Sequence, residues 1–136
     1  MPQGVIGPQG VTVITPPARE SYSKIGKIDS TDSTTGVAVF GLPKGAFIAG
    51  VYTISTGANS TGTPTIEAGF ASGDDELLTA FAPDATGYAV AGTYAGSAVG
   101  TQLTADKTVY LKASAALTSA VYVKVEYWLP PVGQAY

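Results

Sequence analysis

Cysteine and histidine are both absent from this chain of 136 residues. The lack of cysteine excludes disulfides, thiolate nucleophiles and cysteine metal sites. The lack of histidine removes the commonest general base and the commonest transition-metal ligand, so histidine-based hydrolase triads and the usual zinc sites are excluded. We therefore expect a protein that is not an enzyme and that binds no cofactor and no metal.

Charge is also scarce. Charged residues make up 12% of the chain, which is about half of the usual ~25%. A surface with so few charges resists association poorly, and it suits a protein that is packed permanently against neighbours. The net charge of -3 and the scattered lysines argue against a nucleic-acid partner, which would need a basic patch.

Long apolar runs are missing as well. None approaches ~18 residues, so we expect no transmembrane helix and no membrane partner. The first residues, Met1 to Gly4, lack the charged and apolar regions of a signal peptide. We expect a protein that is made and used without secretion.

The most regular stretch that is present runs from Val121 to Leu129 and alternates in polarity with period 2, which predicts a strand of an antiparallel sheet. The inner row would be Val121, Val123, Val125, Tyr127 and Leu129, and the outer row Tyr122, Lys124, Glu126 and Trp128. We expect the inner row to lie in a core. The outer row should be covered by a second sheet or by another subunit, because the chain has too few charged residues to keep a large face exposed to solvent.

Further strands are predicted at about 22–28, 37–40, 46–55, 64–70 and 108–114. Residues 41–45 should form a hairpin or a tight connection, and 46–55 a central strand, since both of its faces are apolar. The strand at 108–114 is expected to pair with 121–129, and residues 84–100 should hold weak strands or a long excursion. A short helix is plausible over 72–81, with Leu77, Leu78 and Phe81 as its apolar stripe.

This count of strands predicts an all-β fold, an antiparallel β-sandwich that is jelly-roll-like, with at most one short helix. The predicted divisions are 1–36, an extended N-terminal arm and connector, then 37–129, the sandwich, and 130–136, a C-terminal tail. Gly4, Gly7 and Gly10 begin three collagen-like triplets, too few to hold a triple helix alone. The arm should be extended; alternatively, three arms run together at a three-fold axis, or the arm lies across a neighbouring protein.

The acidic residues do not show the spacing of a metal site or of a catalytic pair. Asp74, Asp75 and Glu76 form the one acidic cluster, but they lack the alternating spacing of a calcium loop, so we expect a solvated turn or a helix N-terminus. Asp29 and Asp32 lie in a loop rich in Ser and Thr, where local hydrogen bonds to the backbone are the expectation. Nothing marks Glu67 and Glu126, the acids on predicted strands, as a glycosidase pair.

Exposed aromatic residues are the remaining candidates: Tyr52, Tyr110, Tyr122 and Trp128. Three roles stay open for them. They are covered within the chain, by the other sheet or by the N-terminal arm; they anchor a protein interface; or they stack on sugars.

Several short β motifs follow one another at characteristic spacing: Val37 to Ile54 with its Leu42–Ala46 turn, then Thr65–Gly69, Leu103–Leu111 and Val123–Tyr127. This order resembles that of small β-sandwich structural proteins encoded among the head and tail genes of tailed bacteriophages. The resemblance covers residues 37–129 and includes no catalytic signature; the arm lies outside it.

The resemblance implies a virion component that is made in the host cytoplasm. Capsid decoration or cement proteins, which are commonly trimeric and bridge major capsid subunits on the outside of the head, fit best; a head-fibre base, a tail component or a carbohydrate-binding adhesin are the alternatives. The partners would be the major capsid protein and two further copies of this chain. The capsid-anchoring arm would use Gly4, Val5, Ile6, Gly7, Pro8, Gly10, Val11, Val13 and Ile14, and the subunit interface Tyr110, Tyr122, Lys124 and Trp128.

Overall fold

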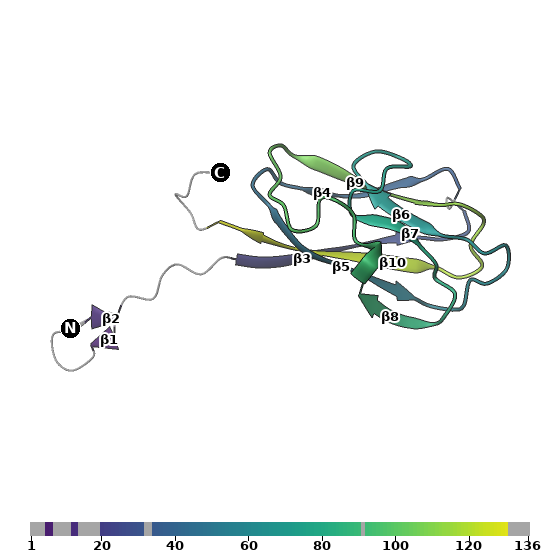
Figure 1. Cartoon of the computed structure of the whole chain (residues 1–136), viewed down its shortest axis with the longest axis horizontal. Coiled ribbons are helices and arrows are strands. Elements are labelled where there is room, and N and C mark those ends of the chain that lie inside the picture. Colours follow the sequence, from purple (N-terminus) through teal and green to yellow (C-terminus); the bar gives the residue numbers. More distant parts are fainter. Residues whose placement is uncertain (1–4, 7–11, 14–19, 32–33, 91, 131–136) are drawn as a thin grey trace.

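The computed structural model describes residues 5–6, 12–13, 20–31, 34–90 and 92–130. Within these residues, two four-stranded antiparallel sheets pack face to face (Figure 1). The first sheet has the order β3 (Glu20–Ile28), β10 (Val121–Leu129), β5 (Phe47–Ser55), β8 (Gly87–Val90). The second has the order β4 (Val37–Leu42), β9 (Lys107–Ala113), β6 (Ile66–Gly69), β7 (Leu78–Phe81).

The chain passes from one sheet to the other at every connection except the one between β6 and β7. Eight antiparallel strands in this order form a jelly roll, with two interleaved Greek keys. The predicted fold class, an all-β jelly-roll-like sandwich, is therefore confirmed. The central position of β5, between β10 and β8, is confirmed too.

The core lies between the sheets and is built from the inner row of each strand. Val121, Val123 and Val125 of β10 are completely buried, as are Val109 and Leu111 of β9. Each such side chain contributes roughly 1.5–3 kcal/mol when it leaves water. The predicted inner row of β10 is confirmed for four of its five residues, because Leu129, at the end of the strand, is only partly buried.

The predicted pairing of 108–114 with 121–129 is wrong. β9 lies in the second sheet between β4 and β6, and β10 lies in the first sheet between β3 and β5. Both strands carry a fully apolar inner row, and the two rows cover each other only when the strands belong to facing sheets. Likewise, β4 and β5 are joined by a tight connection between the sheets and do not form a hairpin.

The helix expected over 72–81 is absent, and β7 begins there at Leu78. The backbone just before β7 is used for other pairing: the Leu77 N–H donates to the Ala68 carbonyl (2.9 Å), and the Glu76 carbonyl accepts from the Ala98 N–H (2.8 Å). The approach is so close that a Cβ on Gly96 would lie 2.2 Å from the Asp75 carbonyl oxygen. These contacts bury Leu77 and Leu78 together, which a short exposed helix would not do.

Among the described residues, helical geometry is limited to the 3₁₀ turn η1 (Gly92–Tyr94), and no helix is long and apolar enough to cross a membrane. β8 and η1 occupy the stretch 84–100, which was expected to hold weak strands or an excursion.

The strand predicted at about 22–28 is confirmed and is slightly longer than expected, as β3. β3 starts at Glu20, within the residues predicted to be arm and connector, and pairs with β10 over its whole length, from Glu20 opposite Leu129 to Ile28 opposite Val121. Further upstream, β1 (Val5–Ile6) pairs antiparallel with β2 (Thr12–Val13). The predicted glycine triplet positions Gly4, Gly7 and Gly10 lie outside the described residues, as does the tail 131–136.

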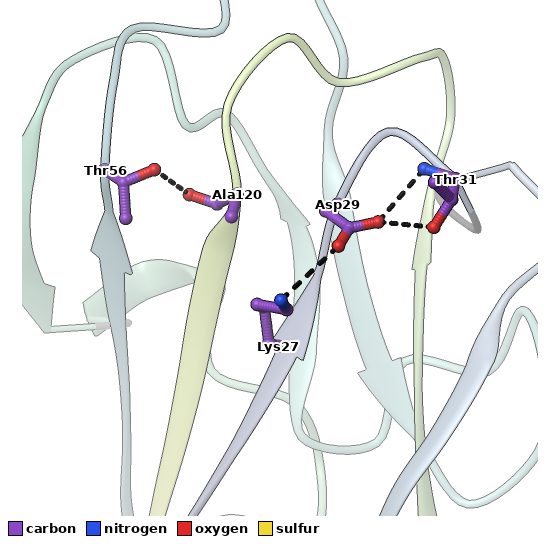
Figure 2. A network of polar contacts seen from close by, with 5 residues as sticks. All are labelled: Lys27, Asp29, Thr31, Thr56 and Ala120. Carbon is purple, nitrogen blue, oxygen red and sulfur yellow. Dashed lines mark hydrogen bonds and ion pairs between the residues drawn. The ribbon is translucent and has the colours of Figure 1, made fainter.

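Local hydrogen bonds hold the loops at one end of the sandwich (Figure 2). The Asp29 carboxylate accepts from the Thr31 hydroxyl (2.7 Å) and backbone N–H (3.0 Å), and Lys27 lies 3.5 Å away. The Thr31 bonds and this lysine hold the pKa of Asp29 below its usual value. The predicted local role of Asp29 is confirmed, whereas Asp32 lies outside the described residues.

Candidate interaction surface

The outer face of the first sheet carries two of the four exposed aromatic side chains of the described chain, Tyr88 and Trp128. It is defined here by the outward residues of four strands: Ile25 and Lys27 of β3, Tyr122, Lys124, Glu126 and Trp128 of β10, Phe47, Tyr52 and Ile54 of β5, and Tyr88 of β8. Their common orientation follows from the register, because residues directly opposite each other in an antiparallel pair share a face.

A polar cluster occupies the middle of this outer face. The Tyr52 hydroxyl donates to Glu126 Oε1 (3.0 Å), and Lys124 Nζ lies 3.3 Å from Glu126 Oε2. The same ammonium lies 5.3 Å from the centre of the Tyr52 ring. The only two ionic groups on β10 thus neutralise each other, and the face as a whole stays weakly charged.

The phenol of Tyr52 is held in its neutral form. Its hydrogen bond to Glu126 raises its pKa, and burial and the negative charge of Glu126 act in the same direction. The ring lies over Gly50, where an added Cβ would meet the Tyr52 hydroxyl at 2.9 Å. A side chain at position 50 would therefore displace the ring from Glu126.

Aromatic pairs extend the outer face on either side of this cluster. Tyr52 and Tyr88 are stacked with ring centres 5.6 Å apart, and Phe47 and Trp128 lie tilted at 6.5 Å. Ile25 is 53% exposed and Trp128 40% exposed. Apolar and aromatic groups around a small satisfied polar centre are the composition of a protein interface.

The second sheet packs on the opposite side of β10, so it does not cover the predicted outer row. Of the explanations offered for this row, coverage by the second sheet is excluded. Coverage by another subunit stays a prediction.

The structure separates the four predicted interface residues. Tyr122, Lys124 and Trp128 lie together on the outer face of the first sheet, whereas Tyr110 lies on β9 between Ala38 and Gly69, on the outside of the second sheet. Of the predicted anchoring residues, Val5, Ile6 and Val13 lie in the β1–β2 ladder, and Gly4, Gly7, Pro8, Gly10, Val11 and Ile14 lie outside the described residues.

Sequence reasoning missed Ile25, Phe47 and Tyr88 as members of the outer face. Their membership depends on which strands flank β10 and β5, and the pattern of a single strand does not contain that information. The stretch from Asp84 to Gly100 did contain a signal, because Tyr88 and Tyr94 are its only aromatic residues among many Ala and Gly.

The acidic residues do not assemble into a catalytic or metal site. Glu67 lies on the outside of the second sheet and Glu126 on the outside of the first, so the two carboxylates face away from each other. Glu76 accepts from the Phe70 N–H (2.9 Å), while Asp74 and Asp75 are exposed. No group of three acidic, cysteine or histidine side chains in the described residues is placed to hold a metal ion.

No protein-family model and no curated protein sequence matches this chain. The solved structures that share its fold include chains from two phage capsids. A chain in the acidic stable capsid of Helicobacter pylori bacteriophage KHP30 superposes with a TM-score of 0.60 at 17% identity, over 81% of this chain and 88% of that one. A chain in the capsid asymmetric unit of cyanophage Pam1 superposes with a TM-score of 0.56 at 20% identity, over 89% of this chain and 95% of that one. At these identities the likeness shows a common jelly-roll fold.

Proposed function

We propose that this chain is a non-enzymatic bacteriophage virion protein of the head, which binds the outside of the capsid as a decoration or cement protein and stabilises it by bridging major capsid subunits. The observation that carries the proposal is the likeness to chains in two phage capsids. It spans 81% and 89% of this chain and 88% and 95% of the two matched chains. The likeness therefore extends over most of each matched chain and is not confined to one part of it.

The composition supports permanent contact with neighbouring proteins. Only 12% of the residues are charged, and the outer face of the first sheet presents Trp128, Tyr122 and Ile25 around one internal ion pair. Burial of this ion pair in a contact costs less than burial of either charge alone, because Lys124 and Glu126 pair with each other.

We assign the subunit contact of a homotrimer to this outer face, with Tyr122, Lys124 and Trp128 at its centre. A three-fold contact joins two different patches of each subunit, and the ring closes only if those patches are inclined toward one axis. The outer faces of the two sheets point in opposite directions. A closed ring of three subunits therefore cannot use one of these faces for each of the two neighbours. Tyr110 then belongs to a second surface, available for the capsid.

The arm is the proposed capsid anchor. Because β3 starts opposite the end of β10, the arm and the C-terminal tail leave the sandwich at the same end. An arm that binds only the assembled lattice stabilises that lattice by its own free energy of binding. Val5, Ile6 and Val13 supply apolar groups for that contact.

Deletion of residues 1–19 tests the anchor while it keeps all of β3. We expect the truncated protein to fold, with unchanged circular dichroism, and to bind purified heads that lack this protein at least about tenfold more weakly. A matched control is Tyr94→Ala, which changes an exposed aromatic residue far from the arm in sequence and leaves the arm intact. Head binding of undiminished affinity by the truncated protein would refute the anchoring role. Failure of the full-length protein to bind heads at all would refute the decoration role itself.

A further inference from the structure

A groove of about 330 Å³ opens between the two sheets, where β7 ends and β8 begins. It lies along the sandwich edge formed by β8 and η1, which Figure 1 shows near each other. The groove is lined by Ser55 of β5, Phe81 of β7, Asp84 and Thr86 of the connecting loop, Tyr88 of β8 and Tyr94 of η1. It is separate from the β10 residues that centre the proposed subunit contact.

Two tyrosine rings in this groove are both exposed and fixed in orientation. Tyr88 is 58% exposed, yet its ring is stacked on Tyr52 with an interplanar angle of 19°. Tyr94 is 41% exposed, and its ring meets Phe81 edge-on at 5.5 Å. The Tyr94 carbonyl also accepts from the Thr79 hydroxyl (3.1 Å), which holds η1 against β7. A ligand that stacks on these rings therefore causes little further loss of side-chain conformational entropy.

The polar groups of the groove are unused within the described part of the chain. Ser55 is 3% exposed, it lines the groove, and its hydroxyl makes no hydrogen bond to a described residue. This hydroxyl is therefore able to exchange hydrogen bonds with a ligand hydroxyl in the groove. The exposed carboxylate of Asp84 likewise has no hydrogen-bond or ion-pair partner among the described residues, so it is available to accept from ligand hydroxyls.

We propose that this groove binds a neutral hexose ring of a glycan. The apolar face of a pyranose packs on the exposed tyrosine rings, and its hydroxyls donate to Asp84 and exchange hydrogen bonds with Ser55. No lysine or arginine lines the groove, while Asp84 does, so the lining disfavours phosphates and acidic sugars. The volume lies at the lower end of the ~300–1,000 Å³ range of small-molecule sites, which suits one or two sugar rings better than a folded protein surface. This binding does not depend on attachment to a capsid.

The test is a two-dimensional ¹H–¹⁵N NMR titration of the full chain with glucose, galactose, mannose, rhamnose and N-acetylglucosamine, each to about 50 mM. We expect at least one sugar to shift the backbone amides of residues 81–89 and Tyr94 in a saturable way, with a Kd in the millimolar range. Tyr94→Ala and Asp84→Ala should each weaken that binding by about tenfold or more. Asp84→Ala keeps the test valid if Tyr94→Ala misfolds, since the exposed Asp84 side chain has no hydrogen-bond or ion-pair partner among the described residues.

Asp75→Ala is the matched control for Asp84→Ala, because it removes an exposed carboxylate that does not line the groove and should leave the sugar titration unchanged. The proposal fails if none of the five sugars shifts the groove amides, or if Tyr94→Ala and Asp84→Ala bind as well as the parent. It also fails if a peptide of residues 1–20 saturates the same amides while the sugars do not, since the groove would then bind protein.

Discussion

Tyr52 connects the separate parts of the outer face of the first sheet. Its hydroxyl bonds to Glu126, its ring lies near Lys124 Nζ, and its far side stacks on Tyr88. One residue therefore links the centre of the proposed subunit contact to a wall of the proposed sugar groove. Occupation of either surface can be followed through the ionisation of this phenol.

The pKa of Tyr52 is expected to lie above the ordinary tyrosine value, chiefly because of the Glu126 hydrogen bond. Since the raised pKa belongs to the folded state, the stabilisation is fully present below the ordinary pKa of ~10 and is lost as pH rises through the folded value. Glu126→Gln should lower the pKa of Tyr52 toward the ordinary value, as measured by the tyrosinate absorbance or by NMR. Glu67→Gln, which changes a carboxylate on the opposite outer surface, should leave it unaltered. An equal response to both substitutions would contradict the assigned cause.

At the scale of elements, the connections between sheets are held by Asn59. This residue is 1% exposed, and its side-chain oxygen accepts from the backbone N–H groups of Thr118 and Ser119, both at 2.8 Å. Its own N–H donates to the Pro83 carbonyl (2.9 Å). Three connections that lie far apart in sequence therefore meet at this one residue, through its side chain and its backbone N–H.

Asn59→Ala is expected to lower the free energy of unfolding by about 1–3 kcal/mol, because two partly buried backbone hydrogen bonds would lose their acceptor. Chemical denaturation followed by tryptophan fluorescence measures the change. Asn59→Asp retains the acceptor oxygen and should cost less, and Ser60→Ala, at the exposed neighbouring position, should stay within about 0.5 kcal/mol of the parent. A loss for Asn59→Ala no larger than that for Ser60→Ala would show that the connections do not depend on this residue.

The individual strands could be predicted from sequence, but their partners could not. The period-2 pattern of 121–129 located β10 and its buried row correctly, because burial of alternate residues is a local property. The partner of β10 depends on loops that cross between the sheets, and the pattern of 108–114 is equally compatible with a neighbour in the same sheet and with one in the facing sheet. The helix expected at 72–81 is absent for a related reason: Gly96, which lies further along the chain, lets its backbone approach Asp75 and Glu76, and the local pattern does not contain this contact.

The same limit applies to the candidate surface. Tyr122, Lys124 and Trp128 were predicted to lie on one face from β10 alone, and the structure places them together. The assignment of Tyr110 to the same surface required knowledge of the sheet that contains β9. Ser55 and Asp84 lie in one groove only because β5 and the β7–β8 loop meet in space.

At the scale of the whole molecule, the proposed subunit contact predicts the state of the free protein. Light scattering coupled to size exclusion should give a mass of three chains of 13.7 kDa each at micromolar concentration. Trp128→Lys places a charge at the centre of the contact and should shift the protein toward single chains. Tyr110→Lys, the same change on the outside of the second sheet, should leave the mass unaltered. A parent protein that runs as one chain, or equal dissociation by both variants, would exclude this surface as the contact.

The pairing of β3 with β10 also has a mechanical consequence. The arm joins the sandwich at Glu20, and β3 is paired with β10 through all nine of its residues. A pull on the arm along the strand therefore loads the hydrogen bonds of this ladder together, in shear, and does not open them one at a time. Lys24 Nζ, which donates to the Gly41 carbonyl (2.7 Å), adds a link from the same strand to the second sheet. A subunit tethered by its arm would thus be loaded in the direction in which the β3–β10 ladder resists force best. A protein that holds a pressurised shell closed would experience a pull of this kind.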